Sequence, residues 1–154
     1  MGKPGFSKRD NKTRCMNSAI YSLAMREHSR KELFDKLKRK DFSEGVDLDA
    51  LLDELEENNY LNEERFVESF IRSRIARGQG ELKIINDLRQ RGIGALLINN
   101  AMQEANIDWF VLALGQREKK FGKNKPAEFK EKAKQMRFLS SRGFSAEIIR
   151  AVVG

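Results

Sequence analysis

The six residues LRQRGI at positions 88–93 recur in pattern 51 residues later, as LSSRGF at 139–144, and 51 residues earlier, as LKRKDF at 37–42. Each copy has a leucine first, a basic residue fourth and an apolar residue sixth. The match continues further along, because residues 97–98 correspond to 148–149 and residues 101–102 to 152–153. A repeated length of this size predicts tandem copies of one helical unit.

The pattern has a local physical meaning. The leucine is the last core contact of one helix, and the apolar residue anchors the start of the next. Gly92 and Gly143 lie between them, where glycine takes the left-handed conformation that ends a helix. The first copy has Asp41 at this position and about five extra residues before the following helix.

Apolar residues follow helical spacing from Asn17 onward, and no segment alternates with the period of a strand. Ser29 with Glu32 forms a predicted capping box, and Asp47, Asn62 and Asp108 are predicted N-caps. We expect an all-α chain of three tandem three-helix repeats, about nine helices, that form an elongated, curved array. The expected divisions are a disordered or vector-derived basic arm at 1–16 and repeats at 17–60, 61–106 and 107–154. Without a long heptad pattern, a monomer is expected.

The composition excludes several classes of protein. One histidine, His28, and one cysteine, Cys15, among 154 residues are too few for a hydrolase triad, a histidine-ligated zinc site or an internal disulfide. Residues 115–123 do not match a phosphate-binding loop, and no apolar run is long enough to span a bilayer. We therefore expect a cytoplasmic protein that is not an enzyme, has no cofactor or metal and does not associate with membranes.

The formal net charge of +7 is unevenly distributed. Residues 43–68 contain one basic and ten acidic side chains, a net charge of −9, so the rest of the chain carries +16. The acidic helices are expected to repel nucleic acid or to receive a basic protein surface, and the alternative is that their acidic residues form a solvated face.

Four basic runs are candidates for contact with a nucleic acid or a nucleoprotein. Any single run is better explained as a solvated helix face, but together the runs favour contact with phosphates. Few aromatic residues lie among them, so contact with the backbone is expected rather than reading of bases. The candidate contact residues are Lys38, Arg39, Lys40, Arg72, Arg74, Arg77, Lys83, Arg89, Arg91, Arg117, Lys119, Lys120, Lys123 and Lys125.

Several motifs, taken in order, resemble a known family. They are NYLNEERFVESFI at 59–71, RGQG at 77–80 followed by Ile84, Leu88 and residues 92–93, and the stretch from Glu27 to Leu33. Residues 107–109, 137–139 and 142–144 complete the set. Across residues 17–153 the chain resembles the bacterial regulatory protein family RecX. It departs at Asn62, where the family usually has Asp, and at Asp41, where Gly is usual.

The resemblance implies an all-helical modulator of the recombinase RecA that acts in homologous recombination and DNA repair. Members of that family bind the RecA filament, inhibit its extension, ATPase activity and strand exchange, and have affinity for single- and double-stranded DNA. Two alternatives remain from the residues themselves. Three short helices with a glycine turn also suit a sequence-specific regulator of the helix-turn-helix kind, and a nucleic-acid-processing enzyme is the third possibility.

Overall fold

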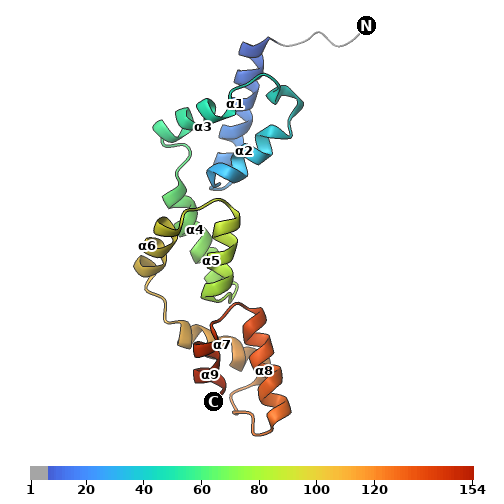
Figure 1. Ribbon diagram of the computed structural model, residues 1–154, viewed down its shortest axis with the longest axis vertical. Coiled ribbons are helices and arrows are strands. Elements are labelled where there is room, and N and C mark those ends of the chain that lie inside the picture. Colours follow the sequence, from blue (N-terminus) through green and yellow to red (C-terminus); the bar gives the residue numbers. More distant parts are fainter. Residues whose placement is uncertain (1–6) are drawn as a thin grey trace. The chain divides into compact units, whose positions relative to one another are not determined.

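The computed structural model describes residues 7–154 and contains only helices over this range (Figure 1). The first group is α1 (Lys8–Met25), α2 (Arg30–Lys38), the short 3-10 helix η1 (Asp41–Ser43) and α3 (Leu48–Glu57). The second is α4 (Glu63–Ala76), α5 (Glu81–Gln90) and α6 (Ala95–Ala105). The third is α7 (Trp109–Phe121), α8 (Phe129–Ser141) and α9 (Ala146–Val153). The expected all-α class with three groups of three α-helices is confirmed.

The chain divides into two compact units. The N-terminal unit contains the described residues up to Val67 together with Arg91–Ile93, and the C-terminal unit contains Glu68–Gln90 and Gly94–Gly154. The division falls within the second group of helices, because the first residues of α4 and the α5–α6 turn at 91–93 belong to the N-terminal unit. In that turn, Arg91 lies 3.8 Å from Glu32 of α2.

The N-terminal unit has a leucine-rich core between α1, α2 and α3. Cys15 and Ala19 of α1 contact Leu33 and Leu37 of α2 and the inner leucines of α3. Burying such side chains stabilises the unit by about 1.5–3 kcal/mol for each one.

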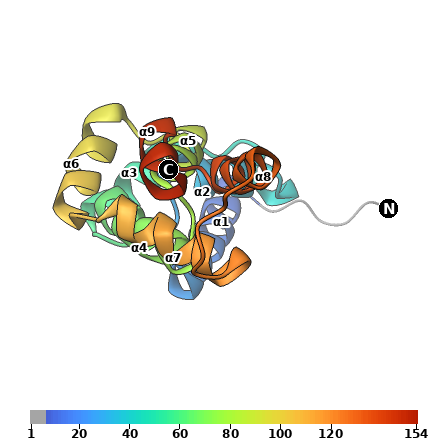
Figure 2. The ribbon, with the colours of Figure 1, turned by 90° about the horizontal axis from the view of Figure 1, so that it is seen from below.

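In the C-terminal unit, α7, α8 and α9 pack together around a second core (Figure 2). Ala113 of α7, Leu139 of α8 and Val152 of α9 are at its centre. The equivalence of the repeats extends to burial, since the side chains of Leu37, Leu88 and Leu139 are each 0% exposed.

The expected disordered arm is wrong for residues 8–16, which form the first half of α1. Ser7 accepts a hydrogen bond from the Asp10 backbone N–H and caps this helix, and Cys15 is fully buried in its core face. The first repeat therefore does not begin at residue 17. The part of the expected arm at residues 1–6 lies outside the described residues. The predicted caps are confirmed, since Ser29, Asp47, Asn62 and Asp108 each accept a backbone N–H at the start of a helix.

Among the helices of the described chain, none combines the length and apolar character that crossing a bilayer requires.

Candidate nucleic-acid interface

Four basic side chains of the C-terminal unit line one pocket of about 270 Å³. Arg77 follows the end of α4, Lys119 and Lys120 are in the last turns of α7, and Arg142 follows α8. Gln116, Ala76 and the ring of Phe138 complete the lining. Three of the four were predicted as contact residues from separate basic runs, and the fold brings these runs together.

A close backbone contact positions the pocket. The backbone N–H of Gly80 donates to the carbonyl of Arg142 at 2.7 Å, and that of Leu82 donates to the carbonyl of Gly143 at 2.9 Å. A Cβ on Gly80 would lie 2.4 Å from the Gly143 carbonyl carbon, so only glycine permits this approach. The turn after α4, which carries Arg77, is thereby held against the end of α8, which carries Arg142.

The aromatic ring of Phe138 lies against two of the cations. The Lys120 ammonium is 5.6 Å from the centroid of the ring and the Arg142 guanidinium is 5.1 Å from it. Cation–π contacts of this kind contribute about 0.5–1 kcal/mol each at exposed sites. They restrict two flexible side chains without neutralising them.

No acidic partner balances the pocket. Across residues 7–154, no carboxylate lies within ion-pair distance of Arg77, Lys119, Lys120 or Arg142. Four like charges around one cavity repel one another, and a polyanion relieves this repulsion when it binds. The pocket suits phosphate groups.

Most of the other predicted contact residues are exposed but do not join this pocket. They are Lys38 at the end of α2, Arg39 and Lys40 after it, Arg72 on α4, Lys83 and Arg89 on α5, and Lys123 and Lys125 between α7 and α8.

Arg74 and Arg117 are corrections to the predicted interface. The Arg74 guanidinium is 3.2 Å from Asp87, 3.3 Å from Gln79 and 4.4 Å from the centroid of the Phe70 ring, so the fold of the unit engages it. Arg117 is only 2% exposed, and its Nη2 donates to the backbone carbonyl of Lys123. Arg117 is therefore too buried to contact a partner, whereas Arg74 is partly exposed and its guanidinium is already engaged within the unit.

Arg91 is half-buried in the N-terminal unit, with its Nε 3.8 Å from a carboxylate oxygen of Glu32. Glu32 is also the acidic residue of the capping box on α2. Arg91 therefore contributes to packing around α2, and less of its side chain is accessible to a phosphate group.

Arg142 lines the pocket but is not among the contact residues predicted from the sequence. Arg142 aligns with Lys40 and Arg91 at the basic position of the repeat, and that alignment was the available signal. The signal was ambiguous because a cation near the end of a helix is favourable to the helix dipole in any case.

The acidic stretch is partly neutralised within its own unit. The Arg30 guanidinium at the start of α2 lies 2.7 Å from Asp53, 3.1 Å from Glu56 and 3.6 Å from Asp49 of α3. Lys12 of α1 lies 3.7 Å from Glu54. Acidic residues of α3 therefore form ion pairs that connect α3 to α1 and α2.

The described residues contain no group of three or more histidine, cysteine, aspartate or glutamate side chains arranged to hold a metal ion.

Comparison with known families assigns the three helical groups separately. Residues 15–46 match the first three-helix domain of RecX, residues 62–102 the second and residues 107–153 the third.

Known proteins similar to the chain over most of its length carry the same family name. Regulatory protein RecX of Halorhodospira halophila is 42% identical over 135 residues, which cover 88% of this chain and 83% of that protein. Regulatory protein RecX of Legionella pneumophila is 40% identical over 140 residues, covering 91% of this chain and 93% of the relative.

Solved structures share the fold. The crystal structure of RecX from Lactobacillus salivarius superposes with a TM-score of 0.76 at 22% identity. The superposition covers 94% of this chain and 96% of the Lactobacillus salivarius chain. A second crystal structure, of a regulatory protein RecX, superposes with a TM-score of 0.79 over 94% of this chain and 73% of that one. From the three matched domains and the identity to these relatives, the chain belongs to the RecX family of regulatory proteins.

Proposed function

We propose that this protein regulates homologous recombination and DNA repair by binding the RecA–DNA filament. Binding inhibits extension of the filament, its ATPase activity and strand exchange. The protein acts by occupying the filament and has no turnover of its own. Membership of the RecX family supports the partner, and the basic pocket with no acidic partner carries the argument for contact with DNA.

The pocket acts on the backbone of the nucleic acid. Its four cations come from three helix ends, and lysine and arginine at such positions bind phosphate oxygens without regard to base. Phe138 contacts the cations with its ring face, so the ring supports charge and is not free for base stacking. We therefore expect affinity that depends strongly on salt and weakly on sequence.

The test compares two variants that lose the same charge. Lys119→Gln with Lys120→Gln removes two cations of the pocket, whereas Lys130→Gln with Arg150→Gln removes two exposed cations outside it. Binding to single-stranded DNA is measured by fluorescence anisotropy over a range of salt concentrations. The slope of log affinity against log salt should fall by about 0.7 for each phosphate that the pocket variant no longer neutralises.

The same proteins are then titrated into a RecA ATPase assay on single-stranded DNA. The wild type should inhibit turnover, the pocket variant should inhibit less at each concentration, and the control should match the wild type. Absence of inhibition by the wild type would contradict the proposed function. Equally weakened inhibition in both variants would contradict the role of the pocket. A strong preference for one of two oligonucleotides of equal length would favour the sequence-specific regulator instead.

A further inference from the structure

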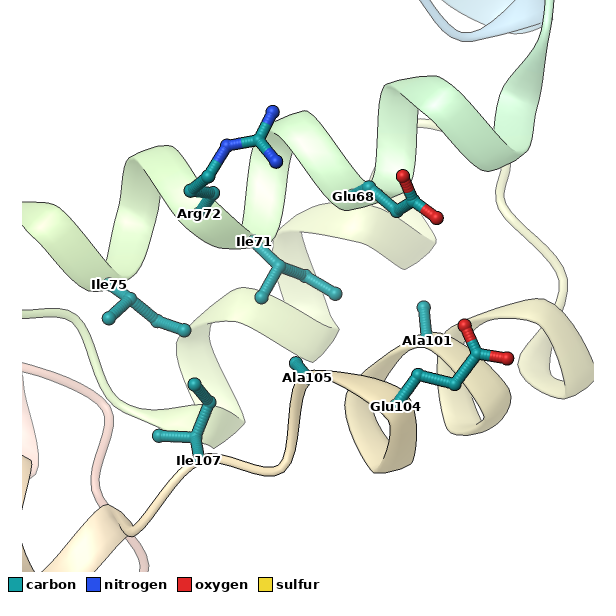
Figure 3. Close-up of a pocket in the computed structure, with 8 residues that line it drawn as sticks. All are labelled: Glu68, Ile71, Arg72, Ile75, Ala101, Glu104, Ala105 and Ile107. Carbon is teal, nitrogen blue, oxygen red and sulfur yellow. The ribbon is translucent and has the colours of Figure 1, made fainter.

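A second pocket of the C-terminal unit, between α4 and α6, is apolar along its floor. It has a volume of about 410 Å³. Ile71 and Ile75 of α4 face Ala101 and Ala105 of α6 across it, and Ile107 closes one end (Figure 3). We call this pocket the α4–α6 groove. Its size is that of a site for one or two large side chains.

The groove is open because a small residue occupies a key repeat position. Ala101 is related to Val152 by the 51-residue offset. In the third helical group, Val152 is 2% exposed and fills the core against α7 and α8. In the second group, the single methyl of Ala101 is smaller than a valine side chain and leaves space between α6 and α4.

One end of the groove is acidic. Glu68 of α4 and Glu104 of α6 extend their carboxylates toward the same end, opposite Ile107, and both are exposed (Figure 3). Neither carboxylate is paired with a cation anywhere in residues 7–154. Arg72 lies on the α4 rim. An apolar floor beside two unpaired carboxylates complements a ligand that is apolar with a cation next to it.

We propose that the α4–α6 groove binds a protein segment carrying a large apolar side chain beside a lysine or arginine. The apolar side chain lies between the isoleucines of α4 and the alanines of α6, and the cation lies between Glu68 and Glu104. This proposal rests on the proposed function, because the partner that carries the segment is RecA. The groove thus takes the protein component of the filament, whereas the basic pocket takes its DNA.

Nucleic acid does not suit this groove. Two carboxylates at its mouth repel phosphate, and its lining contains no aromatic ring on which a base stacks. The two pockets belong to the same unit, and α4 contributes residues to both, so one rigid element connects the two kinds of contact.

The test changes the groove in two independent ways. Glu68→Lys with Glu104→Lys reverses its charge, and Ala101→Leu with Ala105→Leu fills its floor with good helix formers. Glu44→Lys with Glu57→Lys is the matched control, because both residues are exposed and unpaired in the N-terminal unit and the net charge changes equally. Circular dichroism confirms that each variant is folded.

Binding of fluorescently labelled protein to RecA in the absence of DNA is measured first. Both groove variants should bind about tenfold more weakly than the wild type. The control should bind as the wild type does, and single-stranded DNA affinity should not fall in any of the three.

Binding to overlapping peptides that span the RecA sequence is measured next. Peptides retained by the wild type and released by Glu68→Lys with Glu104→Lys should contain an apolar residue adjacent to a lysine or arginine. If both groove variants bind RecA as tightly as the wild type, the groove proposal is wrong while the proposed function stands. If the wild type neither binds RecA nor inhibits its ATPase activity, the proposed function fails and the groove has no RecA segment to bind.

Discussion

Arg117 illustrates at the scale of one residue how burial overrides sequence context. It lies among exposed lysines, yet its side chain is buried, and its Nε and Nη1 find no acceptor in the described part of the chain. Only Nη2 is engaged, with the carbonyl of Lys123. A buried cation with two donors unmatched is costly for folding, and its stem acts mainly as apolar filling of the α7–α8 region.

We predict that Arg117→Met unfolds at the same or a higher denaturant concentration than the wild type, because methionine fills a similar volume without burying a charge. Arg117→Ala leaves a cavity and should lose about 2–4 kcal/mol. Urea unfolding of both variants measures the difference.

The DNA affinity of Arg117→Met provides the second readout. It should change much less than that of the Lys119→Gln and Lys120→Gln variant, because a buried guanidinium does not contact phosphate. A decrease as large as in the pocket variant would contradict the structural role.

At the level of single helices, capping residues in the sequence predict correctly where several helices begin. Ser29 and Glu32 form the full capping box, with the Ser29 side chain accepting from the Glu32 backbone and the Glu32 side chain accepting from that of Ser29. These bonds need only residues three apart, so the sequence suffices to predict them.

The start of α1 at Lys8 is not evident from the sequence, because it depends on contacts with distant residues. Residues 8–16 are mostly polar, and the part of α1 before Asn17 buries only Cys15 fully. A single buried residue makes no periodic pattern. The tertiary contact of Cys15 with α2, α3 and η1 is what stabilises this first half of the helix.

The end of α8 depends on glycine more strictly than the end of α5. Gly143 has a φ of +96°, and a Cβ there would lie 2.3 Å from the Cβ of Lys83 and 2.8 Å from its backbone nitrogen. At Gly92, with a φ of +81°, the nearest atom is the Cβ of Lys31 at 3.0 Å. The stricter requirement at Gly143 comes from the close approach that builds the basic pocket.

We predict that Gly143→Ala destabilises the protein by about 2 kcal/mol or more, from left-handed strain together with the clash. Gly115→Ala, inside α7 where a Cβ meets nothing within 4 Å, should stabilise it by about 0.5–1 kcal/mol. Thermal unfolding of the pair measures both effects, and similar values for the two would show that the Gly143 contact is unimportant.

At the scale of the molecule, charge is organised differently in the two units. In the N-terminal unit, Arg30 and Lys12 compensate part of the acidic α3. In the C-terminal unit, four cations of one pocket and two carboxylates of the α4–α6 groove have no partner of opposite charge among residues 7–154. These six unpaired charges lie where we propose that partners bind.

His28 makes the stability of the N-terminal unit depend on pH. Its side chain is 2% exposed, and Nδ1 donates to the carbonyl of Arg26 at 2.9 Å. Burial lowers the pKa of His28 below its ordinary 6.5, and the positive charges of Arg26 and Lys36 lower it further. The hydrogen bond to the Arg26 carbonyl and the negative charge of Glu32 raise the pKa, but burial has the largest effect. As pH falls below 6.5, the unfolded chain takes up a proton that folded His28 does not, so the free energy of unfolding decreases down to the lowered pKa.

We predict that His28→Asn removes this decrease, because an asparagine amide donates to the same carbonyl and does not titrate. Urea unfolding followed by circular dichroism between pH 7.5 and pH 5 measures the slope, and the comparison of the two proteins cancels the contribution of Glu63, whose pKa is raised by burial. Fluorescence of Trp109, the only tryptophan, reports on the C-terminal unit and should be unaffected. Identical pH slopes in both proteins would contradict the role of His28.

The helical class, the 51-residue repeat, four helix starts and the family follow from the amino-acid sequence alone, because each depends on residues close together or on a pattern kept along the chain. The sequence also indicated the abundance of cations that phosphate binding needs. Which cations line one pocket depends instead on contacts between distant helices. Arg77 and Arg142 are 65 positions apart, and the contact of Gly80 with Gly143 brings them to one pocket. Burial of Arg117 and the space left by Ala101 are likewise set by side-chain packing between helices, which no local pattern encodes.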